Sequence, residues 1–188
     1  MRVVKKPEER RAEMVAAASK LFAQQGFVRT SVAEIVSAVD VAKGLFYYYF
    51  TTKDEMVKAV VEGYASYLGS EAQKIAAGEG TAREKAAKLM GHEAWNQCFT
   101  QPLLRDLCLP QHAALYSDMC DRVFDHMRPA VCDILAQGMR ERGVDAAQAE
   151  KIAGVGMYGV LMMARRGEMS MESAAELFSF LAGAQPAA

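Results

Sequence analysis

The sequence predicts an all-α protein, and three observations support this fold class. Apolar residues recur at helical spacing along the chain, and no segment alternates polar and apolar residues as a strand would. Gly and Pro punctuate the helical segments. Of the 188 residues, 52% are hydrophobic, which supplies enough apolar side chains for a substantial core.

The first helix is expected to begin at Pro7, because a helix start tolerates the missing N–H of proline. Its apolar side chains fall on one stripe. Gly26 is expected to end it in left-handed backbone. The stripe consists of Met14, Val15, Ala18, Leu21 and Phe22.

A second, short helix should follow a capping box formed by Ser31 and Glu34. It is expected to stop near Asp40, since aspartate tolerates a left-handed turn. A third short helix is predicted from about Ala42 to Tyr49. Two short helices joined by a tight turn and braced by the first helix are typical of a helix-turn-helix, whose second helix lies in the major groove of DNA.

A long fourth helix is expected to start at a second capping box, formed by Thr52 and Glu55. We therefore assign residues 1–53 to a helix-turn-helix domain and residues 53–77 to a connecting helix. The glycine-rich break at Gly78–Gly80 then begins a helical domain over residues 78–188. In that domain we expect helices at about 82–99, 103–109, 113–142, 146–165 and 171–183, with Pro129 kinking the third of them.

The third helix has an unusual composition for a buried helix. Lys43 and Gly44 open it, and five consecutive aromatic residues, 46–50, follow. An aromatic cluster is more often core than surface, but five in a row spread around the helix axis and cannot all face inward. A lysine and tyrosine hydroxyls suit phosphate oxygens, and Gly44 lets another surface approach the backbone closely.

The charge distribution agrees with a nucleic-acid partner at the front of the chain. Residues 1–60 carry ten Lys and Arg against seven Asp and Glu, whereas residues 61–188 carry twelve against sixteen. A basic N-terminal part and an acidic remainder fit an N-terminal segment that meets phosphates, although ordinary solvated surface explains the charges about as well.

The segments 26–35 (GFVRTSVAEI), 41–50 (VAKGLFYYYF) and 53–55 resemble the TetR family of repressors, and the resemblance covers about residues 8–60. It implies that Lys43 and Gly44 approach bases and that Leu45 faces the groove. Ala42 stands where the family usually has Ser or Thr, so a hydroxyl is lost at the helix start. The phosphate contacts that the resemblance implies are Arg29, Thr30, Tyr47, Tyr48, Tyr49 and Lys53.

The resemblance also implies a homodimeric transcriptional repressor on a palindromic DNA operator, with a C-terminal helical ligand-binding and dimerisation domain that releases DNA when a small-molecule effector binds. A two-fold protein would present its recognition helices one DNA turn apart. Residues expected at the dimer interface share two apolar helix faces: Ile152, Val155, Gly156, Gly159, Val160 and Met163, then Leu177, Phe178 and Leu181.

The effector is expected to be largely apolar, because the twelve methionines of the chain favour an adaptable apolar cavity. Ordinary core packing is the competing interpretation of each of these side chains. The candidate pocket residues are Trp95, Phe99, Cys108, Tyr116, Met119, Cys120, Phe124, Met127, Met157 and Leu161.

Other function classes are less well supported by the residues. The alternative is a redox- or metal-responsive regulator that uses Cys98 or Cys108, or His92, Glu93, His112 and His126, of the C-terminal domain. An enzyme with a Cys108–His112 pair is disfavoured by the intervening Pro110. A helical interaction protein would leave Lys43 and the tyrosines unexplained.

No cofactor or metal is expected. Residues 154–159 match GxGxxG, but no strand precedes them, so a dinucleotide site is rejected. The cysteines form no CxxC pair, which argues against structural zinc. With a charged N-terminus and no apolar stretch long enough to span a bilayer, we expect a cytoplasmic protein without membrane contact.

Overall fold

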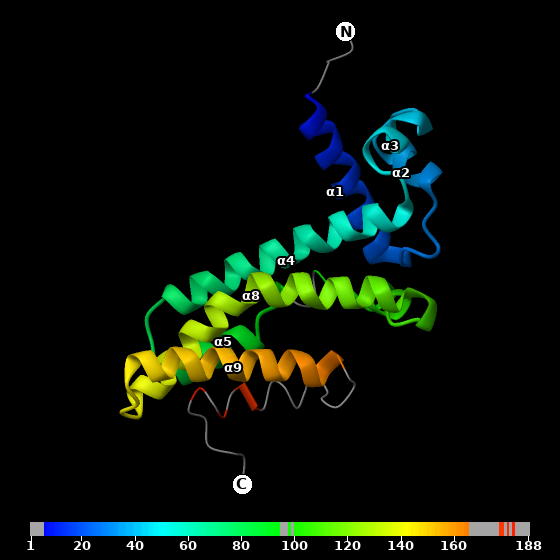
Figure 1. Ribbon diagram of the computed structural model, residues 1–188. Helices are drawn as coiled ribbons and strands as arrows, with labels where there is room; N and C mark the ends of the chain where they lie inside the picture. The colour runs from blue at the N-terminus through cyan, green and yellow to red at the C-terminus, as the bar shows by residue number, and fades with distance from the viewer. Residues whose placement is uncertain are drawn as a thin grey trace. The chain divides into compact units, whose positions relative to one another are not determined.

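A computed structural model describes residues 6–94, 98, 100–165, 177, 178, 180 and 182, except for the side chains of residues 101, 157, 160, 161, 164 and 165. The described residues form helices and no strands, which confirms the predicted all-α class (Figure 1). The elements are α1 (Pro7–Gln25), α2 (Val32–Ala38), α3 (Lys43–Tyr49), α4 (Lys53–Ala77), α5 (Ala82–Met90), α7 (Gln101–Leu107), the 3-10 helix η1 (Pro110–His112), α8 (Ala113–Glu141) and α9 (Ala146–Arg165).

The described residues divide into two compact units. The first lies within Met1–Tyr64 and Trp95–Met119, and the second within Ala65–Ala94 and Cys120–Ala188. Helices α4 and α8 therefore contribute residues to both units. The expected functional division at residue 78 rests on sequence and stays a prediction.

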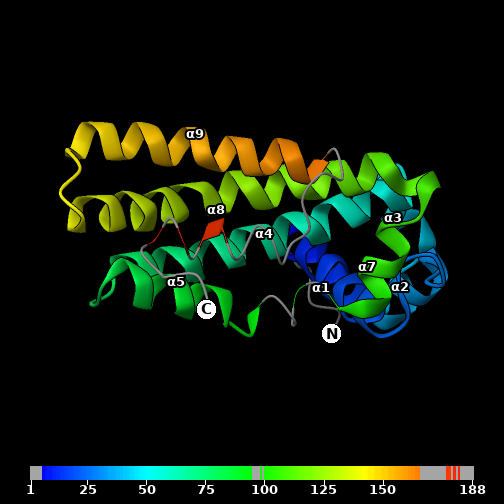
Figure 2. The ribbon, with the colours of Figure 1, turned by 90° about the horizontal axis from the view of Figure 1, so that it is seen from below.

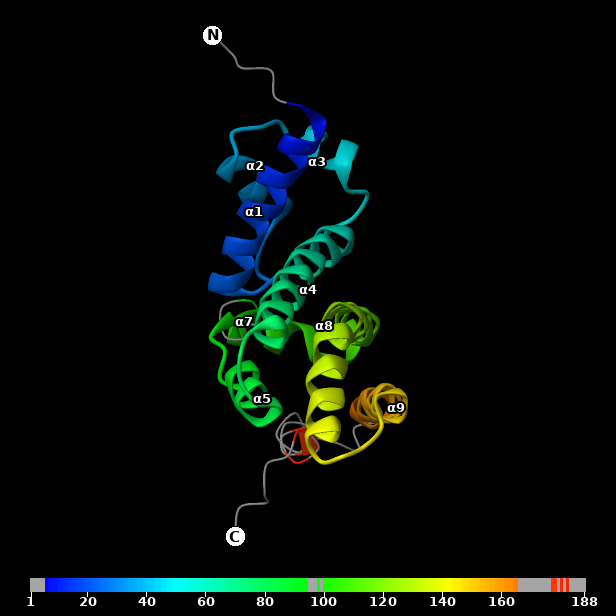
Figure 3. The ribbon, with the colours of Figure 1, turned by 90° about the vertical axis from the view of Figure 1, so that its left-hand side faces the viewer.

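The first unit contains the predicted helix-turn-helix, with α2 and α3 joined by a tight turn and braced by α1 (Figure 3). Fully buried side chains from all three helices meet in its core. Asp40 adopts φ 51°, the left-handed backbone predicted for the turn. The buried set includes Met14, Ala18, Phe22, Ile35 and Phe46.

Local helix-end signals are largely confirmed. Pro7 begins α1, and the Ser31–Glu34 capping box begins α2. Gly26 ends α1 with φ 84° and ψ 163°, so it has the positive φ expected of the stop but a ψ far from the helical left-handed value, a combination that favours glycine. At the start of α4, Glu55 N–H donates to Thr52 Oγ1 as expected, but its carboxylate accepts from Thr51 N–H, one residue before the predicted partner.

One predicted helix is too long. The helix expected at 82–99 ends at Met90, because Gly91 caps it and donates its N–H to Ala87 O. Helix α7 begins two residues earlier than predicted, with Pro102 in its first turn, while α8 and α9 match their predicted ranges within one residue. Most of the helix expected at 171–183 lies outside the described residues.

In the second unit, α8 and α9 run side by side in opposite directions (Figure 2). The α4–α5 turn is tied to α8 by the buried Lys85, whose Nζ donates to Ala76 O (2.8 Å) and Gln137 Oε1 (2.9 Å). Helices α4 and α8 approach closely at Gly69, where a Cβ would lie 2.7 Å from His126 O. Within the described part of the chain, no helix is both long and apolar enough to cross a bilayer.

Candidate nucleic-acid interface

Helix α3 divides its aromatic run between core and surface. Phe46 and Phe50 are buried, with ring centroids 5.6 Å apart, and they anchor the helix to the first unit. Tyr47 and Tyr48 are 52% and 74% exposed. Tyr49 is half-buried, and its ring meets that of Tyr48 edge-on. The division follows the helical geometry that argued against a wholly buried run.

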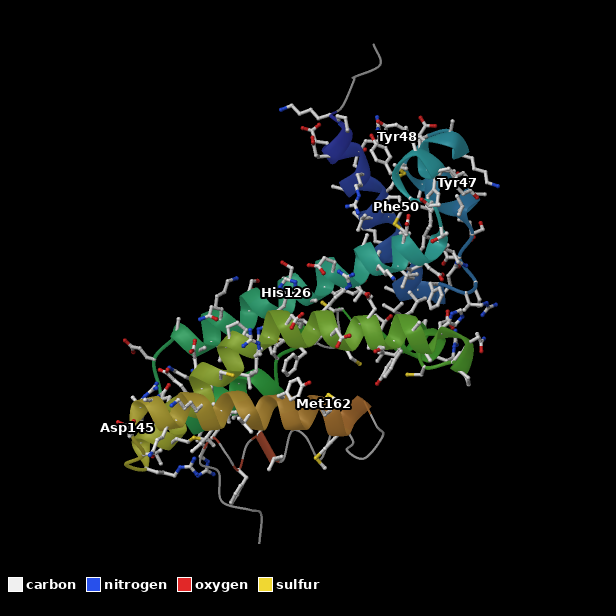
Figure 4. The ribbon with its side chains drawn as sticks, in the orientation of Figure 1. Tyr47, Tyr48, Phe50, His126, Asp145 and Met162 are labelled. Atoms are coloured by element: carbon white, nitrogen blue, oxygen red, sulfur yellow. The ribbon has the colours of Figure 1, made fainter. Side chains whose placement is uncertain are left out.

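The start of α3 is open to solvent. Ala42 is the N-cap residue and makes no side-chain capping bond, as expected where a hydroxyl is missing. Lys43 and Gly44 are exposed in the first turn, and a Cβ on Gly44 would meet nothing within 4 Å among the described residues. Leu45 is half-buried. The exposed side of α3 thus offers a cation and a bare backbone at one end. The phenol groups of Tyr47 and Tyr48 follow further along the helix (Figure 4).

The turn between α1 and α2 places two predicted residues very differently. Arg29 is exposed. Thr30 is 1% exposed, and its hydroxyl donates to Gly26 O (2.7 Å) while accepting from Gln25 Nε2 (3.2 Å). The hydroxyl of Thr30 therefore holds the turn together.

Lys53, at the start of α4, has its ammonium group among the carbonyls of the same turn. Its Nζ donates to Phe27 O (2.8 Å), Thr30 O (3.2 Å) and Val28 O (3.4 Å). An ammonium has three donors, and three acceptors surround this one. The geometry fixes the α1–α2 turn to α4.

Asp106 of α7 holds the turn from another side. Its carboxylate is 3% exposed, accepts from Val28 N–H (2.9 Å) and pairs with Arg105 (3.3 Å). A Cβ on Gly26 would collide with it, which together with the positive φ explains glycine there. Sequence reasoning missed Asp106, because 78 residues separate it from Val28 and no local pattern links them.

The capping box of α2 adds a local constraint. The carboxylate of Glu34 accepts from the backbone N–H and the hydroxyl of Ser31, both at 2.7 Å, and from Gln25 Nε2 at 3.1 Å. These hydrogen bonds, the backbone one foremost, lower the pKa of the Glu34 carboxyl. The start of α2, and with it the helix-turn-helix, is thus held by side chains from α1 as well as by its own cap.

The predicted pocket residues fall in both units, and several of them lie outside the described residues. In the first unit Met119 is buried, while Cys108 and Tyr116 are exposed. In the second unit Met127 is buried, and Cys120 and Phe124 are half-buried. Trp95, Phe99 and the side chains of Met157 and Leu161 lie outside the described residues, so the pocket stays a prediction.

Helix α9 carries an exposed apolar stripe at the positions predicted for a dimer interface. Val155 is 74% exposed, and Ile152, Gly159 and Met163 are also exposed. Gly156 and Leu177 are half-buried and Phe178 is buried, while Leu181 and the side chain of Val160 lie outside the described residues.

The cysteine and histidine residues show no metal-binding cluster among the described residues. Burial raises the pKa of the Cys98 thiol to about 11, and the pKa of Cys132 is also raised by burial. Cys108 is exposed. His92 Nε2 lies 3.5 Å from Glu71, and the ring of His112 meets Phe27 edge-on at 4.8 Å.

Comparison with known proteins places this geometry in a family. Residues 14–60 match the family of bacterial regulatory proteins described as the tetR family. The transcriptional regulator HbdR of Aromatoleum sp. (strain CIB) is 28% identical over 119 residues, which cover 61% of this chain and 48% of HbdR. The repressor NemR of Escherichia coli (strain K12) is 27% identical over 107 residues, covering 52% and 54%. The chain thus spans about half the length of these curated relatives.

Solved structures share the fold over most of the chain. RolR without ligand superposes with a TM-score of 0.61 at 15% identity, covering 93% of this chain and 91% of RolR. The reduced form of NemR from E. coli gives 0.57 at 20% identity, covering 94% and 99%. The sequence match to the tetR family of bacterial regulatory proteins covers residues 14–60, and beyond them the solved structures show a shared fold.

Proposed function

We propose that this protein is a homodimeric transcriptional repressor that binds a palindromic DNA operator through α3 and releases it when a small molecule binds. The observation that carries the proposal is the exposed side of α3. Lys43 and Gly44 stand clear of the protein while Phe46 and Phe50 anchor the same helix. A short helix held rigidly by one face and presenting a cation on the other is suited to the major groove.

The proposed base contacts are at the start of α3. The Lys43 ammonium reaches base acceptors, and the exposed backbone at Ala42 and Gly44 permits close approach. Leu45 contacts a thymine methyl group. Tyr47, Tyr48 and Tyr49, with Arg29, donate to phosphates on either side. Thr30 and Lys53, whose polar groups already hold the α1–α2 turn, contribute to binding mainly by positioning α2 and α3.

The proposed dimer forms through α9 and a second copy of this chain. An exposed apolar stripe, which includes Ile152 and Val155, runs along more than two turns of α9. An apolar helix face is normally buried against another surface, here the same face of the second copy. A two-fold axis would place two α3 helices one DNA turn, about 34–36 Å, apart, and so match a palindrome.

The proposed effector is a largely apolar small molecule that binds in the C-terminal domain. Among the solved relatives of the fold, RolR has been seen with resorcinol and FadR of Bacillus subtilis with stearoyl-CoA. An effector that binds one arrangement of the dimer better than another shifts the population and so changes DNA affinity. A redox trigger is the weaker alternative, because the raised pKa of Cys98 keeps that thiol protonated near neutral pH and only Cys108 is exposed.

The test is selection of duplexes from a random-sequence library by the purified wild-type protein, followed by gel shifts. A palindromic consensus bound specifically, with affinity that falls as salt rises, supports the proposal. Lys43→Ala should then weaken binding of the dimer to that consensus by about a hundredfold, since each of the two copies loses a base contact worth about 1–3 kcal/mol. Lys58→Ala, an exposed lysine of α4, is the control. Absence of any enriched duplex would overturn the proposal.

A further inference from the structure

The cation of Arg11 sits at the opposite end of α3 from Lys43. Its Cζ lies 4.8 Å from the centroid of the Phe50 ring, and Phe50 is the C-cap residue of α3. Phe50 is buried and donates its backbone N–H to Phe46 O (2.8 Å), so the ring that supports Arg11 is fixed. Arg11 itself is exposed.

The contact with Phe50 leaves N–H donors of this guanidinium for other partners. A cation over an aromatic ring is attracted by the ring itself, and a guanidinium carries five N–H donors. The neighbouring Arg10 pairs with Glu13 at 2.9 Å, whereas no ion pair to Arg11 occurs among the described residues. Arg11 is therefore an exposed cation that lies over a buried ring.

The C-terminal end of α3 needs such a charge if it is to meet DNA. The helix has no basic residue in its last turn, and Tyr47 and Tyr48 offer only neutral hydroxyls there. The last carbonyls of a helix carry partial negative charge, which disfavours a phosphate nearby. In Figure 4 the ring of Tyr48 is drawn on the side of α3 that faces α1, the helix that carries Arg11.

We propose that Arg11 is a phosphate contact: its guanidinium, which lies over the Phe50 ring, binds a DNA backbone phosphate at the C-terminal end of α3. This rests on the proposed function. It adds a phosphate contact from α1 at the C-terminal end of α3, opposite the base contacts proposed at the start of that helix. An arginine can hold a phosphate through two parallel hydrogen bonds, which fixes orientation as well as charge.

The test uses the full chain and a fluorescent 30-base-pair duplex of mixed sequence, because a phosphate contact does not depend on base sequence. Affinity is measured against salt concentration for the wild type, Arg11→Met, Arg11→Lys and Lys20→Met. Methionine keeps an apolar side chain over Phe50 and removes the charge. Lys20→Met removes an exposed charge from the same helix, about 13 Å further along it.

The expected result is a change in the slope of log K against log salt. Arg11→Met should flatten it by about 0.9 for each protein copy on the duplex, or about 1.8 for a dimer, with Arg11→Lys and Lys20→Met unchanged. Should Arg11→Met lose the wild-type circular dichroism, Arg11→Gln replaces it with the same expected slope.

Two failures are distinguishable. A wild-type protein that shows no salt-dependent duplex binding would refute the proposed function itself. Salt-dependent wild-type binding with the same slope in a folded Arg11→Met would refute the phosphate contact alone, and would leave Arg11 as a side chain that only packs on Phe50.

Discussion

Replacing Lys53 by methionine tests whether this residue binds phosphate or holds the α1–α2 turn. The resemblance implies a phosphate contact, yet three carbonyl oxygens surround the ammonium at 2.8, 3.2 and 3.4 Å. Methionine keeps most of the apolar stem and removes all three hydrogen bonds. One bond of good length to a charged group is worth about 1.5–3 kcal/mol, and the two longer ones add little.

We expect Lys53→Met to lower the free energy of unfolding by about 2 kcal/mol, because Lys53 is only half-buried and water can reach some of the released carbonyls. For a chain of this size that corresponds to a fall in Tm of about 4–8 °C. Thermal denaturation at fixed protein concentration measures it, with Lys58→Met, an exposed lysine of the same helix, expected within about 0.5 kcal/mol of wild type.

The salt dependence of duplex binding then separates the two roles. A turn that has loosened should weaken binding while the slope of log K against log salt stays at the wild-type value. A slope that falls by about 0.9 per copy, with stability unchanged, would mean that Lys53 leaves the carbonyls and binds phosphate in the complex, and the reasoning from the free structure would be refuted.

Three further outcomes are expected. Gly69→Ala should be less stable than Gly63→Ala by about 1–3 kcal/mol in urea denaturation. Both variants gain helix propensity, but only at position 69 does the new Cβ clash with backbone, because it would lie 2.7 Å from His126 O. Equal stabilities would contradict the close packing of α4 and α8. Val155→Lys should shift sedimentation from dimer to monomer with circular dichroism unchanged, whereas Glu150→Lys on the opposite side of α9 should not; an unaffected dimer would remove this stripe from the interface. Cys98 should react with iodoacetamide at pH 8 more slowly than an exposed thiol, since burial raises its pKa to about 11, and fast labelling would show that the site opens.

The sequence predicted those features that neighbouring residues determine. Ser31 and Glu34 lie within one helical turn, so their mutual hydrogen bonds follow from the pattern alone. Asp40 could be assigned to a left-handed turn from its residue type, because aspartate tolerates that backbone conformation. The helix expected at 82–99 failed because helical periodicity continues past Gly91, where the chain actually leaves the helix.

Contacts between distant segments were beyond such reasoning. Nothing near Asp106 indicates that its carboxylate would accept from Val28 N–H, and nothing near Phe50 indicates that Arg11 would stack on it. The exposed side of α3 was predictable in outline, since a run of five aromatics must divide between core and surface. Which tyrosines are exposed depends on how α3 docks against the rest of the first unit, α2 included, and that docking is set by packing rather than by local pattern.

The number of positive side chains in the N-terminal region does not give the number of phosphate contacts, as Arg11 and Lys53 show. Both are cations of the first unit close to the helix-turn-helix. Arg11 is exposed and lies over an aromatic ring, whereas Lys53 has carbonyl acceptors around its ammonium. Removing the first should change the number of counterions released by DNA binding, and removing the second should change the stability of the free protein. A cation such as Lys53, whose hydrogen bonds are made within the fold, positions the DNA-binding helices. A cation such as Arg11, which makes no ion pair among the described residues, can bind a phosphate of DNA.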